Sequence, residues 1–395
     1  MNVLIIETPS FGLDDAKESF TRLGHKIISF KDENIYERKS EAFVEKFRNA
    51  VNKNNIDIVF SINYYPIVSM CCKELWSMEN RVKYISIVYD NPHIGLYHYS
   101  LINSCNFVFI FDYSMYDELK SGGVNTVYYL PLPVNTDRYD RILKKSEKYA
   151  NDISFVGHFY NESHNLYDRL ISGLENVKDG KYVKGYLDGV VEMQSRVDGY
   201  FFAEEMLNDE VLKVMKEAYP YEPAKDSIAT EKYVYGSYFL GRKSTEIARI
   251  RLLKVLSEEL PVSIYTPGII KELPGAVNKG SIDWYNETPQ VFYNSKININ
   301  ITLKSIKTGI PFRVLDIMAA KGFVITNYQE DLFRHFEPDI DFVYYNEEKD
   351  LVNKAKYYLE HEDERNTIAL NGYNKVKKMC NYADVLREIL EGVQE

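Results

Sequence analysis

Two lysines, an arginine and an aspartate stand close together in the stretch LKSIKTGIPFRVLD (303–316). Lys304 and Lys307 precede Gly309, where the backbone can approach a ligand closely. The proline two residues later suits the first position of a helix, whose free N–H groups and positive dipole end attract anions. Arg313 adds a planar fork that suits a diphosphate. We therefore interpret this stretch as a candidate phosphate site.

Asp316 follows Arg313 by three residues, so both are predicted to lie on one face of the helix. A carboxylate at this place can accept two hydrogen bonds from the cis-diol of a ribose. The alternative is an arginine–aspartate pair on the surface of a well-capped helix. The spacing alone favours neither interpretation.

Other candidate contacts follow two apolar runs. Gly157 and His158 come at the end of the run DISFV (152–156), where backbone meets ligands in parallel α/β folds. Tyr265 precedes a Pro-Gly turn and could line the pocket of a nucleobase. In both places the alternative is a turn that only reverses the chain.

Asp90 and His93 stand together in VYDNPHIG (88–95), after another apolar run. A histidine that is hydrogen-bonded by a carboxylate can act as a base, or can donate to a substrate hydroxyl. The alternative is a turn aspartate that caps the next helix, beside a surface histidine. We favour a catalytic pair, because the chain has only seven histidines.

Several sites are disfavoured by their missing patterns. The first apolar run is followed by ETPSFG, which is not the G-x-G-x-x-G of a dinucleotide site, and no P-loop pattern occurs. The sequence DID (339–341) is better explained as a solvated acidic turn than as a metal motif. No cluster has the spacing of metal ligands, and none of the four cysteines forms a CxxC pair. We therefore expect no metal, and we expect reduced thiols in a cytoplasmic protein.

The elements that must position these residues are read from periodicity. Continuous apolar runs predict strands buried on both faces, and amphipathic segments lie between them. The predicted strands are 2–8, 26–30, 57–62, 83–89, 107–111, 126–130, 152–161, 262–266, 296–302, 322–326 and 341–345. This alternation indicates an α/β protein with two Rossmann-like, doubly wound parallel sheets.

We predict two domains and a C-terminal return. Residues 1–135 form the first Rossmann-like domain, and 136–375 form the second, with a helical insertion at about 165–240. A proline-rich segment, 129–139, is interpreted as the hinge between them. The last helix, 376–395, is predicted to pack back on the first domain.

The bulk composition restricts the partners. A formal net charge of -10 argues against nucleic acid and against an anionic membrane, because both need a basic face. The first apolar run is too short for a signal peptide, and no apolar stretch reaches the ~20 residues of a membrane span. We therefore expect a cytoplasmic protein without a membrane span.

The stretch NINITLKSIKTGIPFRVLDIMAAKGFVITNYQEDLFRHFEP (298–338) resembles the spore-maturation-protein-B-like (CgeB-type) glycosyltransferases, with a glycosyltransferase family 1/4-like C-terminal domain. The segments DISFVGHFYN, YLPLPVNTDRY and the C-terminal helices are similar to the same family, so the resemblance covers most of the chain. The matching positions are Asn300, Gly309, Ile310, Pro311, Arg313, Val314, Asp316, Gly322, Phe323, Thr326 and Asn327.

The resemblance implies a GT-B architecture, in which two Rossmann-like domains face a cleft. It implies transfer of a sugar from a nucleotide sugar, most often a UDP-sugar, to a hydroxyl of a glycan, a protein or a small molecule. No cofactor or metal is implied. The second domain would hold the donor, with Asp316 on the ribose, and the first would present the acceptor to Asp90 and His93.

The chain departs from the broader family pattern at two positions. Thr308 stands where a glutamate usually begins the E-x7-E motif, and His158 follows Gly157 in place of an arginine or lysine. Lys304, Lys307 and Arg313 are the candidate substitutes. The departures keep two rivals open: a GT-B-fold sugar-nucleotide epimerase or hydrolase, and a catalytically silent nucleotide- or glycan-binding protein associated with a coat.

Overall fold

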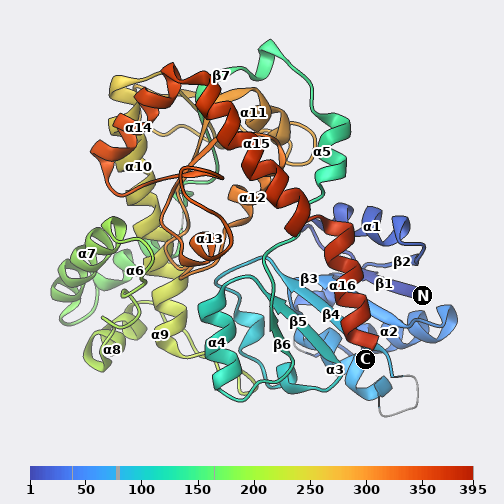
Figure 1. Cartoon of the computed structure of the whole chain (residues 1–395). Coiled ribbons are helices and arrows are strands. Elements are labelled where there is room, and N and C mark those ends of the chain that lie inside the picture. Colours follow the sequence, from blue (N-terminus) through green and yellow to red (C-terminus); the bar gives the residue numbers. More distant parts are fainter. Residues whose placement is uncertain (38, 77–80, 164, 395) are drawn as a thin grey trace. The chain divides into compact units, whose positions relative to one another are not determined.

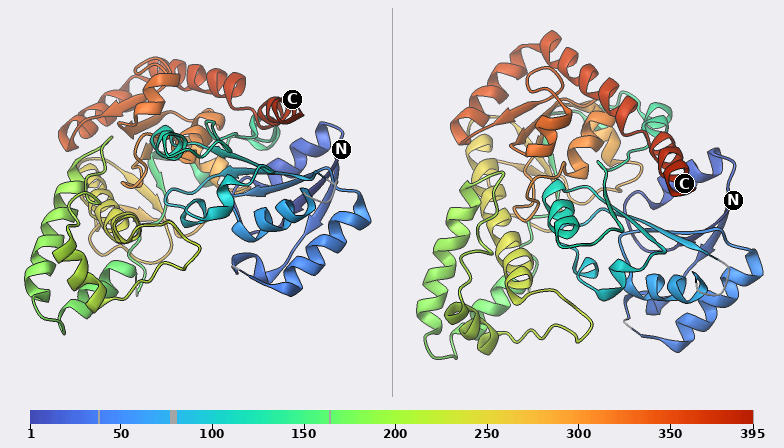
Figure 2. Two further views of the ribbon diagram at one scale, coloured as in Figure 1. Left: turned by 90° about the horizontal axis from the view of Figure 1, so that it is seen from below. Right: turned by 60° about the horizontal axis from the view of Figure 1, so that its bottom comes forward.

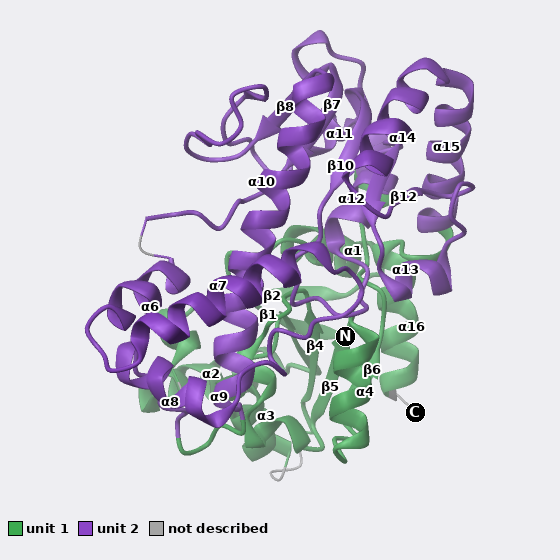
Figure 3. Ribbon diagram, turned by 90° about the vertical axis from the view of Figure 1, so that its left-hand side faces the viewer, with its two compact units in different colours: residues 1–138, 225–228, 378–395 green, residues 139–224, 229–377 purple. Residues whose placement is uncertain are grey.

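The computed structural model describes residues 1–37, 39–76, 81–163 and 165–394, which form two compact units (Figure 3). Unit 1 contains residues 1–138, 225–228 and 378–395. Unit 2 contains residues 139–224 and 229–377. None of the helices in these ranges is long and apolar enough to cross a membrane.

Unit 1 is built on a parallel six-stranded sheet in the order β2-β1-β3-β4-β5-β6 (Figure 1). Every pairing in it is parallel, as predicted from the continuous apolar runs. Its strands are β1 (Asn2–Ile6), β2 (Lys26–Phe30), β3 (Ile58–Ile62), β4 (Lys83–Val88), β5 (Asn106–Ile110) and β6 (Val127–Tyr129).

Helices flank this sheet. They are α1 (Leu13–Arg22), α2 (Glu41–Asn54), α3 (Pro66–Trp76), α4 (Tyr113–Ser121), the start of α5 (Thr136–Ile142) and α16 (Tyr382–Gln394), with short 3-10 turns η1 (Glu33–Tyr36), η2 (Ile94–Leu96) and η3 (Tyr99–Ile102). The bounds of α2 follow from its caps. The Ser40 side chain accepts from the Phe43 N–H, and Asn55 ends the helix in a left-handed conformation with φ 48°.

Unit 2 has a second parallel sheet, in the order β12-β11-β10-β7-β8-β9. Its strands are β7 (Asn151–Val156), β8 (Val262–Tyr265), β9 (Val277–Asn278), β10 (Ser295–Asn300), β11 (Val324–Asn327) and β12 (Val343–Tyr345). The central strands of this sheet carry three fully buried isoleucines, Ile153, Ile297 and Ile325. They belong to the same hydrophobic core as Leu253 and Leu256 of the long helix α10. Every predicted strand is confirmed, and β9 is the one addition among the described residues.

The helices of unit 2 are α6 (Leu166–Leu174), α7 (Gly180–Arg196), α8 (Asp209–Ala218), α9 (Glu231–Tyr233), α10 (Gly241–Glu259), α11 (Thr288–Asn294), α12 (Phe312–Ala319), α13 (Glu330–His335), α14 (Glu348–Glu360) and α15 (Glu362–Met379). A 3-10 turn, η4 (Glu147–Tyr149), precedes β7, and a π-helix, η5 (Val234–Leu240), runs into α10. The predicted helical insertion corresponds to α6–α9, which form a layer beside α10 in Figures 1 and 2.

The sequence pattern predicts a helix that runs from Pro311 to about Lys321 and stops at Gly322, and the end of α12 differs from this. The helix ends at Ala319, and Lys321 takes the left-handed conformation with φ 57°. Gly322 is required for another reason: a Cβ atom there would lie 2.8 Å from both Asn298 Nδ2 and the Phe292 carbonyl oxygen. The glycine thus lets the chain enter β11 against its neighbours.

Candidate functional site

The order of the strands in unit 2 places a crevice at β7 and β10. The chain continues from β7 to β8 on one side and later returns to β10 on the other, and β7 and β10 are hydrogen-bonded neighbours. The loops that follow these two strands therefore diverge at their carboxyl ends. In open parallel sheets this switch point is where ligands bind.

Arg249 of α10 joins the two loops at this switch point. Its Nε and Nη2 donate to the carbonyl oxygen of Ile301, at 3.2 and 2.8 Å, and Nη1 donates to the carbonyl oxygen of His158. Its guanidinium also lies over the ring of Tyr160, 5.1 Å from the ring centre. Burial lowers the pKa of Arg249. A buried positive charge is thereby fixed at the carboxyl edge of the sheet.

Arg313, in the first turn of α12, brings a second guanidinium to the same edge. Its Nη1 is buried and has no hydrogen-bond partner among the described residues. Its guanidinium lies 5.2 Å from the ring centre of Trp284. Burial, followed by repulsion from Arg249, lowers the pKa of Arg313 to about 9. Both effects disfavour the charged form of the side chain in the absence of a ligand.

Gly157 and His158 complete this cluster at the end of β7. A Cβ atom on Gly157 would lie 3.2 Å from Nη1 of Arg313, so the guanidinium and the backbone are in close approach. The residue His158 is accessible to solvent, but partial burial of its ring, followed by repulsion from Arg313, lowers its pKa. The loop predicted to meet a ligand therefore lies beside the arginine predicted to bind phosphate.

The approach to α12 supplies further polar groups. The helix has eight residues, and its N-cap residue, Pro311, offers no side-chain hydrogen bond to the first N–H groups. Lys307 is half-buried in the preceding loop, and Gly309 is buried. Thr308, which stands where the family pattern has a glutamate, contacts Asp331 at 3.3 Å.

Lys304 lies in the same loop but points elsewhere. Its ammonium group donates to Asp198 Oδ1 at 2.6 Å and to the Val197 carbonyl oxygen at 3.1 Å. Only 4% of its side chain is exposed, and burial lowers its pKa. The structure thus places Lys304 in an internal ion pair with the turn that follows α7 in the helical insertion.

Asp316 is placed inside unit 2 and not on its surface. The residue is fully buried, and the hydroxyl of Tyr139 donates to its Oδ1. The alternative of a surface arginine–aspartate pair is therefore wrong, because a pair of that kind needs an exposed carboxylate. Asp316 is on the buried side of α12, where Tyr139 holds it, while Arg313 lies beside Gly157.

Tyr265 also points away from the switch point. Although it ends β8, its hydroxyl lies 3.2 Å from Nδ2 of Asn151, the first residue of β7. The ring therefore runs back along the sheet towards the amino ends of the strands. Thr266, the next residue, has a buried hydroxyl without a hydrogen-bond partner among the described residues.

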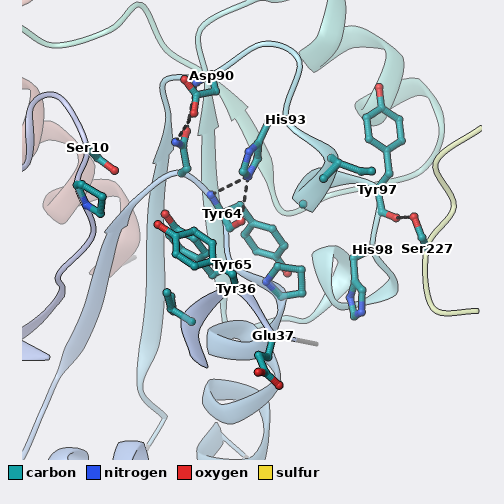
Figure 4. A pocket seen from close by; sticks show the side chains of 16 residues that line it. Ser10, Tyr36, Glu37, Tyr64, Tyr65, Asp90, His93, Tyr97, His98 and Ser227 are labelled. Carbon is teal, nitrogen blue, oxygen red and sulfur yellow. Dashed lines mark hydrogen bonds between the residues drawn. The ribbon is translucent and has the colours of Figure 1, made fainter. Parts of the chain in front are cut away.

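Unit 1 has a cavity at its own switch point, where the chain order reverses between β1 and β3. The cavity has a volume of about 350 Å³. Figure 4 shows its labelled side chains, with Asp90 and Glu37 at opposite ends of the view and tyrosines between them. The loops after β1, β3 and β4 contribute Ser10, Asn63, Tyr64, Tyr65, Asp90 and His93.

Asn63 holds the exposed carboxylate of Asp90 in this cavity. Its Nδ2 donates to Asp90 Oδ2 at 2.7 Å, and its Oδ1 accepts from the backbone N–H groups of Tyr89 and Asp90. Asn63 itself has a φ of 63°, a conformation that asparagine tolerates better than most residues. Asp90 is therefore oriented, while its carboxylate still reaches solvent.

His93 is engaged by the backbone of Tyr64. Its Nε2 lies 3.2 Å from the Tyr64 amide nitrogen and 2.9 Å from the Tyr64 carbonyl oxygen (Figure 4). A Cβ atom on Gly95 would lie 2.9 Å from this nitrogen, so the glycine makes room for the ring. Burial lowers the pKa of His93. The neutral ring fixes the turn after β3 beside Asp90.

The structure thus brings Arg313, Gly157 and His158 together, and it separates Lys304 and Tyr265 from them. Sequence reasoning missed Arg249. Its signal was present, because Arg249 falls three residues before the buried pair Leu252 and Leu253 and is itself on the buried side of the helix. Across the described ranges, no group of three or more His, Cys, Asp or Glu side chains is arranged to hold a metal ion.

Comparison with known proteins agrees with this arrangement. Residues 248–391 match the model of a family described as glycosyl transferase-like. No curated protein sequence matches the chain. The matched region contains Arg249, the loop before α12 and Arg313, whereas Gly157 and His158 of the same switch point precede it.

Three solved structures share the fold over their whole length. Sucrose-phosphate synthase from Thermosynechococcus elongatus is 9% identical, with a TM-score of 0.56, over 100% of this chain and 99% of the other. HepE from Anabaena, solved with UDP and glucose, is 10% identical, with a TM-score of 0.54 and the same coverage. An alpha-glucosyltransferase solved with UDP-glucose and DNA containing an abasic site is 11% identical, with a TM-score of 0.55, over 100% of both chains.

These likenesses confirm the predicted GT-B fold, with two doubly wound parallel sheets. Together with the family match, they support the prediction of a glycosyltransferase.

Proposed function

We propose that unit 2 binds the diphosphate of the donor at Arg313, Arg249 and the first turn of α12. The observation that carries this assignment is a pair of guanidiniums, on the buried Arg249 and on the half-buried Arg313 with its buried Nη1, that have no carboxylate partner among the described residues. Burying a charge without a partner is costly, so such charges are kept where a ligand supplies the opposite sign. A diphosphate at the sheet's switch point fills that role.

The same charges act during transfer. As the acceptor hydroxyl oxygen bonds to the anomeric carbon, the bond from that carbon to the diphosphate breaks, and negative charge grows on the leaving group. Two fixed guanidiniums and the dipole of α12 stabilise that charge in a poorly solvated place. They supply the electrostatic help for which other glycosyltransferases use a cation, so we propose that transfer proceeds without a metal.

A UDP-sugar is the donor that we propose. The support comes from HepE and the alpha-glucosyltransferase, whose structures contain UDP or UDP-glucose. In this chain Gly157, Lys307 and Gly309 border the diphosphate, and the buried hydroxyl of Thr266 is suited to the nucleoside. Asp316 was predicted to bind the ribose directly. Its burial and its hydrogen bond with Tyr139 favour a role in positioning α12.

Unit 1 is proposed to take the acceptor, in the cavity that contains Asp90. The exposed carboxylate, oriented by Asn63, is placed to receive the proton of an acceptor hydroxyl. We propose that Asp90 is the base and that His93 supports it by fixing the turn at Tyr64. The net charge of -10 favours an acceptor other than nucleic acid.

Two broader assignments belong to the same proposal. The motif of residues 298–338, which lies inside the matched family region, supports the spore-maturation-protein-B-like type. A cytoplasmic location is supported by the four cysteines of the chain, all of which are described and are free, buried thiols.

A thermal-shift and calorimetry panel tests the donor site. UDP-glucose, UDP-N-acetylglucosamine, GDP-mannose and free UDP are titrated into the wild type and into Arg313→Met. We expect at least one UDP compound to raise the apparent stability of the wild type by mass action. The affinity of Arg313→Met should be about 100-fold lower, because a charge-assisted contact is worth about 2–3 kcal/mol.

Arg251→Met is the matched control for this experiment. Arg251 lies two residues from Arg249 on α10, but it pairs with Glu348. Its replacement should leave nucleotide affinity within about twofold of the wild type. Equal losses in both variants would contradict the assignment of the anion site, as would a wild type that binds none of the four nucleotides.

A further inference from the structure

A groove adjoins the cavity of unit 1. It lies between the first half of α2, the exposed side of α3 and the turn η3, and its volume is about 1090 Å³. We call it the α2–α3 groove. Its lining includes Ile67, Met70 and Tyr99, and 43% of Met70 and 58% of Tyr99 are exposed. Solvent therefore reaches an apolar and aromatic surface here.

The cavity and the groove share a wall. His98 lines both of them, and the segment 225–228 borders both, with Ser227 on the cavity and Asp226 on the groove. Hydrogen bonds hold this segment against Tyr97: the N–H of Ile228 donates to the Tyr97 carbonyl oxygen at 2.7 Å, and Ser227 Oγ donates to it at 3.1 Å. Figure 4 shows Tyr97, His98 and Ser227 on one side of the cavity.

The α2–α3 groove is about three times as large as the unit 1 cavity. About 350 Å³ suits one small ligand unit, whereas 1090 Å³ exceeds the upper end of ordinary small-molecule pockets, which is about 1,000 Å³. The smaller space contains the proposed base, Asp90. A ligand that fills both has its reacting end in the cavity and its remaining length in the groove.

The chemistry of the groove narrows the class of ligand. It has three basic and four acidic side chains, namely Lys39, Arg48, Lys73, Glu41, Glu45, Glu74 and Asp226. Arg48 and Glu74 form an ion pair at 3.1 Å. A nearly balanced set of this kind disfavours a polyanion. These charged side chains also interrupt the continuous apolar surface that an amphipathic peptide helix would need for binding.

Exposed tyrosines favour a carbohydrate. Tyr36 borders the cavity with 68% of its surface exposed, and Tyr99 borders the groove with 58% exposed. Aromatic rings offer flat apolar faces to the C–H faces of sugar rings, while the neighbouring hydroxyl and amide groups of Ser100 and Asn103 can bond sugar hydroxyls.

We propose that the acceptor is an uncharged oligosaccharide, bound with its terminal sugar in the cavity at Asp90 and the following sugars in the α2–α3 groove. This inference rests on the proposed role of unit 1 as the acceptor side. It makes Tyr99 a specificity-determining residue for acceptor length.

Fluorescent oligosaccharide ladders of one to six sugars test the proposal. Neutral ladders of maltose, cellulose and chitin type, a hyaluronan ladder and a labelled single-stranded oligonucleotide are titrated into the full-length protein with UDP present. We expect at least one neutral ladder to bind, with affinity rising at least tenfold between one and four sugars. The hyaluronan ladder and the oligonucleotide should show no such gain.

Variants connect this gain to the groove. Tyr99→Ala should lose most of the gain with length and leave the affinity of the single sugar unchanged, while Tyr99→Phe should keep the gain. Tyr182→Ala, which removes an exposed tyrosine from α7 of unit 2, is the matched control and should behave as the wild type. Melting temperatures verify that every variant is folded.

The contrary outcomes are distinct. Affinity that does not change with length, a gain that survives Tyr99→Ala, a preference for an anionic chain, or no neutral ladder bound at millimolar concentration would each overturn the proposal. UDP-glucose binding is measured in the same samples. If it persists and depends on Arg313, only the extended acceptor is refuted; if it is absent, the proposed function fails with it.

Discussion

A Cβ atom on Gly157 would stand 3.2 Å from Nη1 of Arg313, so the guanidinium lies closer to this backbone position than an ordinary side chain allows without a shift. This approach couples the end of β7 to the first turn of α12. The two loops that diverge at the switch point are thus proposed to form one anion-binding corner. Arg249 connects these loops by donating hydrogen bonds to a carbonyl oxygen of each.

Gly157→Ala should therefore weaken donor binding. The new methyl group would be in tight contact with both Nη1 of Arg313 and the ring of Phe155, each 3.2 Å from the Cβ position, so both must shift. Overpacking of this kind costs about 1 kcal/mol, so calorimetry should show a Kd for UDP-glucose about fivefold higher. Gly185→Ala is the control, because nothing lies within 4 Å of its Cβ position on α7. An unchanged Kd in Gly157→Ala would refute the shared corner.

Arg313 should lower the free energy of unfolding of the protein when no ligand is bound. Its positive charge is buried, and its pKa is lowered to about 9 by burial and by Arg249. Replacing a buried charge with an apolar side chain of similar length is often neutral or stabilising by about 1 kcal/mol or more. We therefore expect the urea midpoint of ligand-free Arg313→Met to equal or exceed that of the wild type.

Arg251→Met should behave in the opposite way, because it breaks the ion pair with Glu348. Its urea midpoint should fall. A large loss of stability in Arg313→Met would instead show that the guanidinium has a structural role in the ligand-free fold, and that its lack of a carboxylate partner does not mark a ligand site.

His158 should take up a proton when the donor binds. Burial and the repulsion from Arg313 lower its pKa below the ordinary 6.5. Since the unfolded chain then binds the proton more readily, this histidine contributes stability above pH 6.5 that is lost as the pH falls through the folded pKa. A bound diphosphate opposes the repulsion and raises that pKa.

Calorimetry of UDP-glucose at pH 6 in two buffers of different ionisation enthalpy measures this uptake. UDP-glucose is suitable because its diphosphate has no group that titrates near this pH. The uptake should disappear in His158→Gln and persist in His361→Gln, where an exposed histidine stacks on Tyr357. Proton uptake that is the same in all three proteins would exclude His158 from the donor site.

The strands were predictable because a parallel sheet buried on both faces requires continuous apolar runs. All eleven predicted runs contain an observed strand, whereas β9 has only Val277 and Asn278 and gives no such signal. Helix ends were less predictable. Lys321, and not Gly322, adopts the left-handed conformation after α12, because Gly322 is needed for the close approach of Asn298.

The candidate site was predictable where position along the chain determines position in space. Gly157 and Arg313 follow neighbouring strands of one sheet, so they must share its carboxyl edge. The direction of a side chain depends on contacts that are remote in sequence. Lys304 turns to Asp198, and Tyr265 runs back to Asn151, because those partners come from other elements. Periodicity carries no information on such partners.

Lys304 offers a decisive contrast between a structural lysine and a phosphate ligand. Its ammonium group lies 2.6 Å from Asp198 Oδ1, and 4% and 19% of the two side chains are exposed. Removing one partner of a buried pair leaves an uncompensated charge and costs about 3 kcal/mol. Lys304→Met should therefore unfold at a clearly lower urea concentration than the wild type.

The double variant Lys304→Met/Asp198→Leu should recover most of this loss, because both charges are removed together. Its Kd for UDP-glucose should stay within about twofold of the wild type if Lys304 serves only the loop before α12. If Lys304 instead binds phosphate, the double variant should regain its stability but bind UDP-glucose at least tenfold more weakly than the wild type. Urea unfolding and calorimetry on the same preparations therefore distinguish the two roles, since stability and affinity respond independently to them.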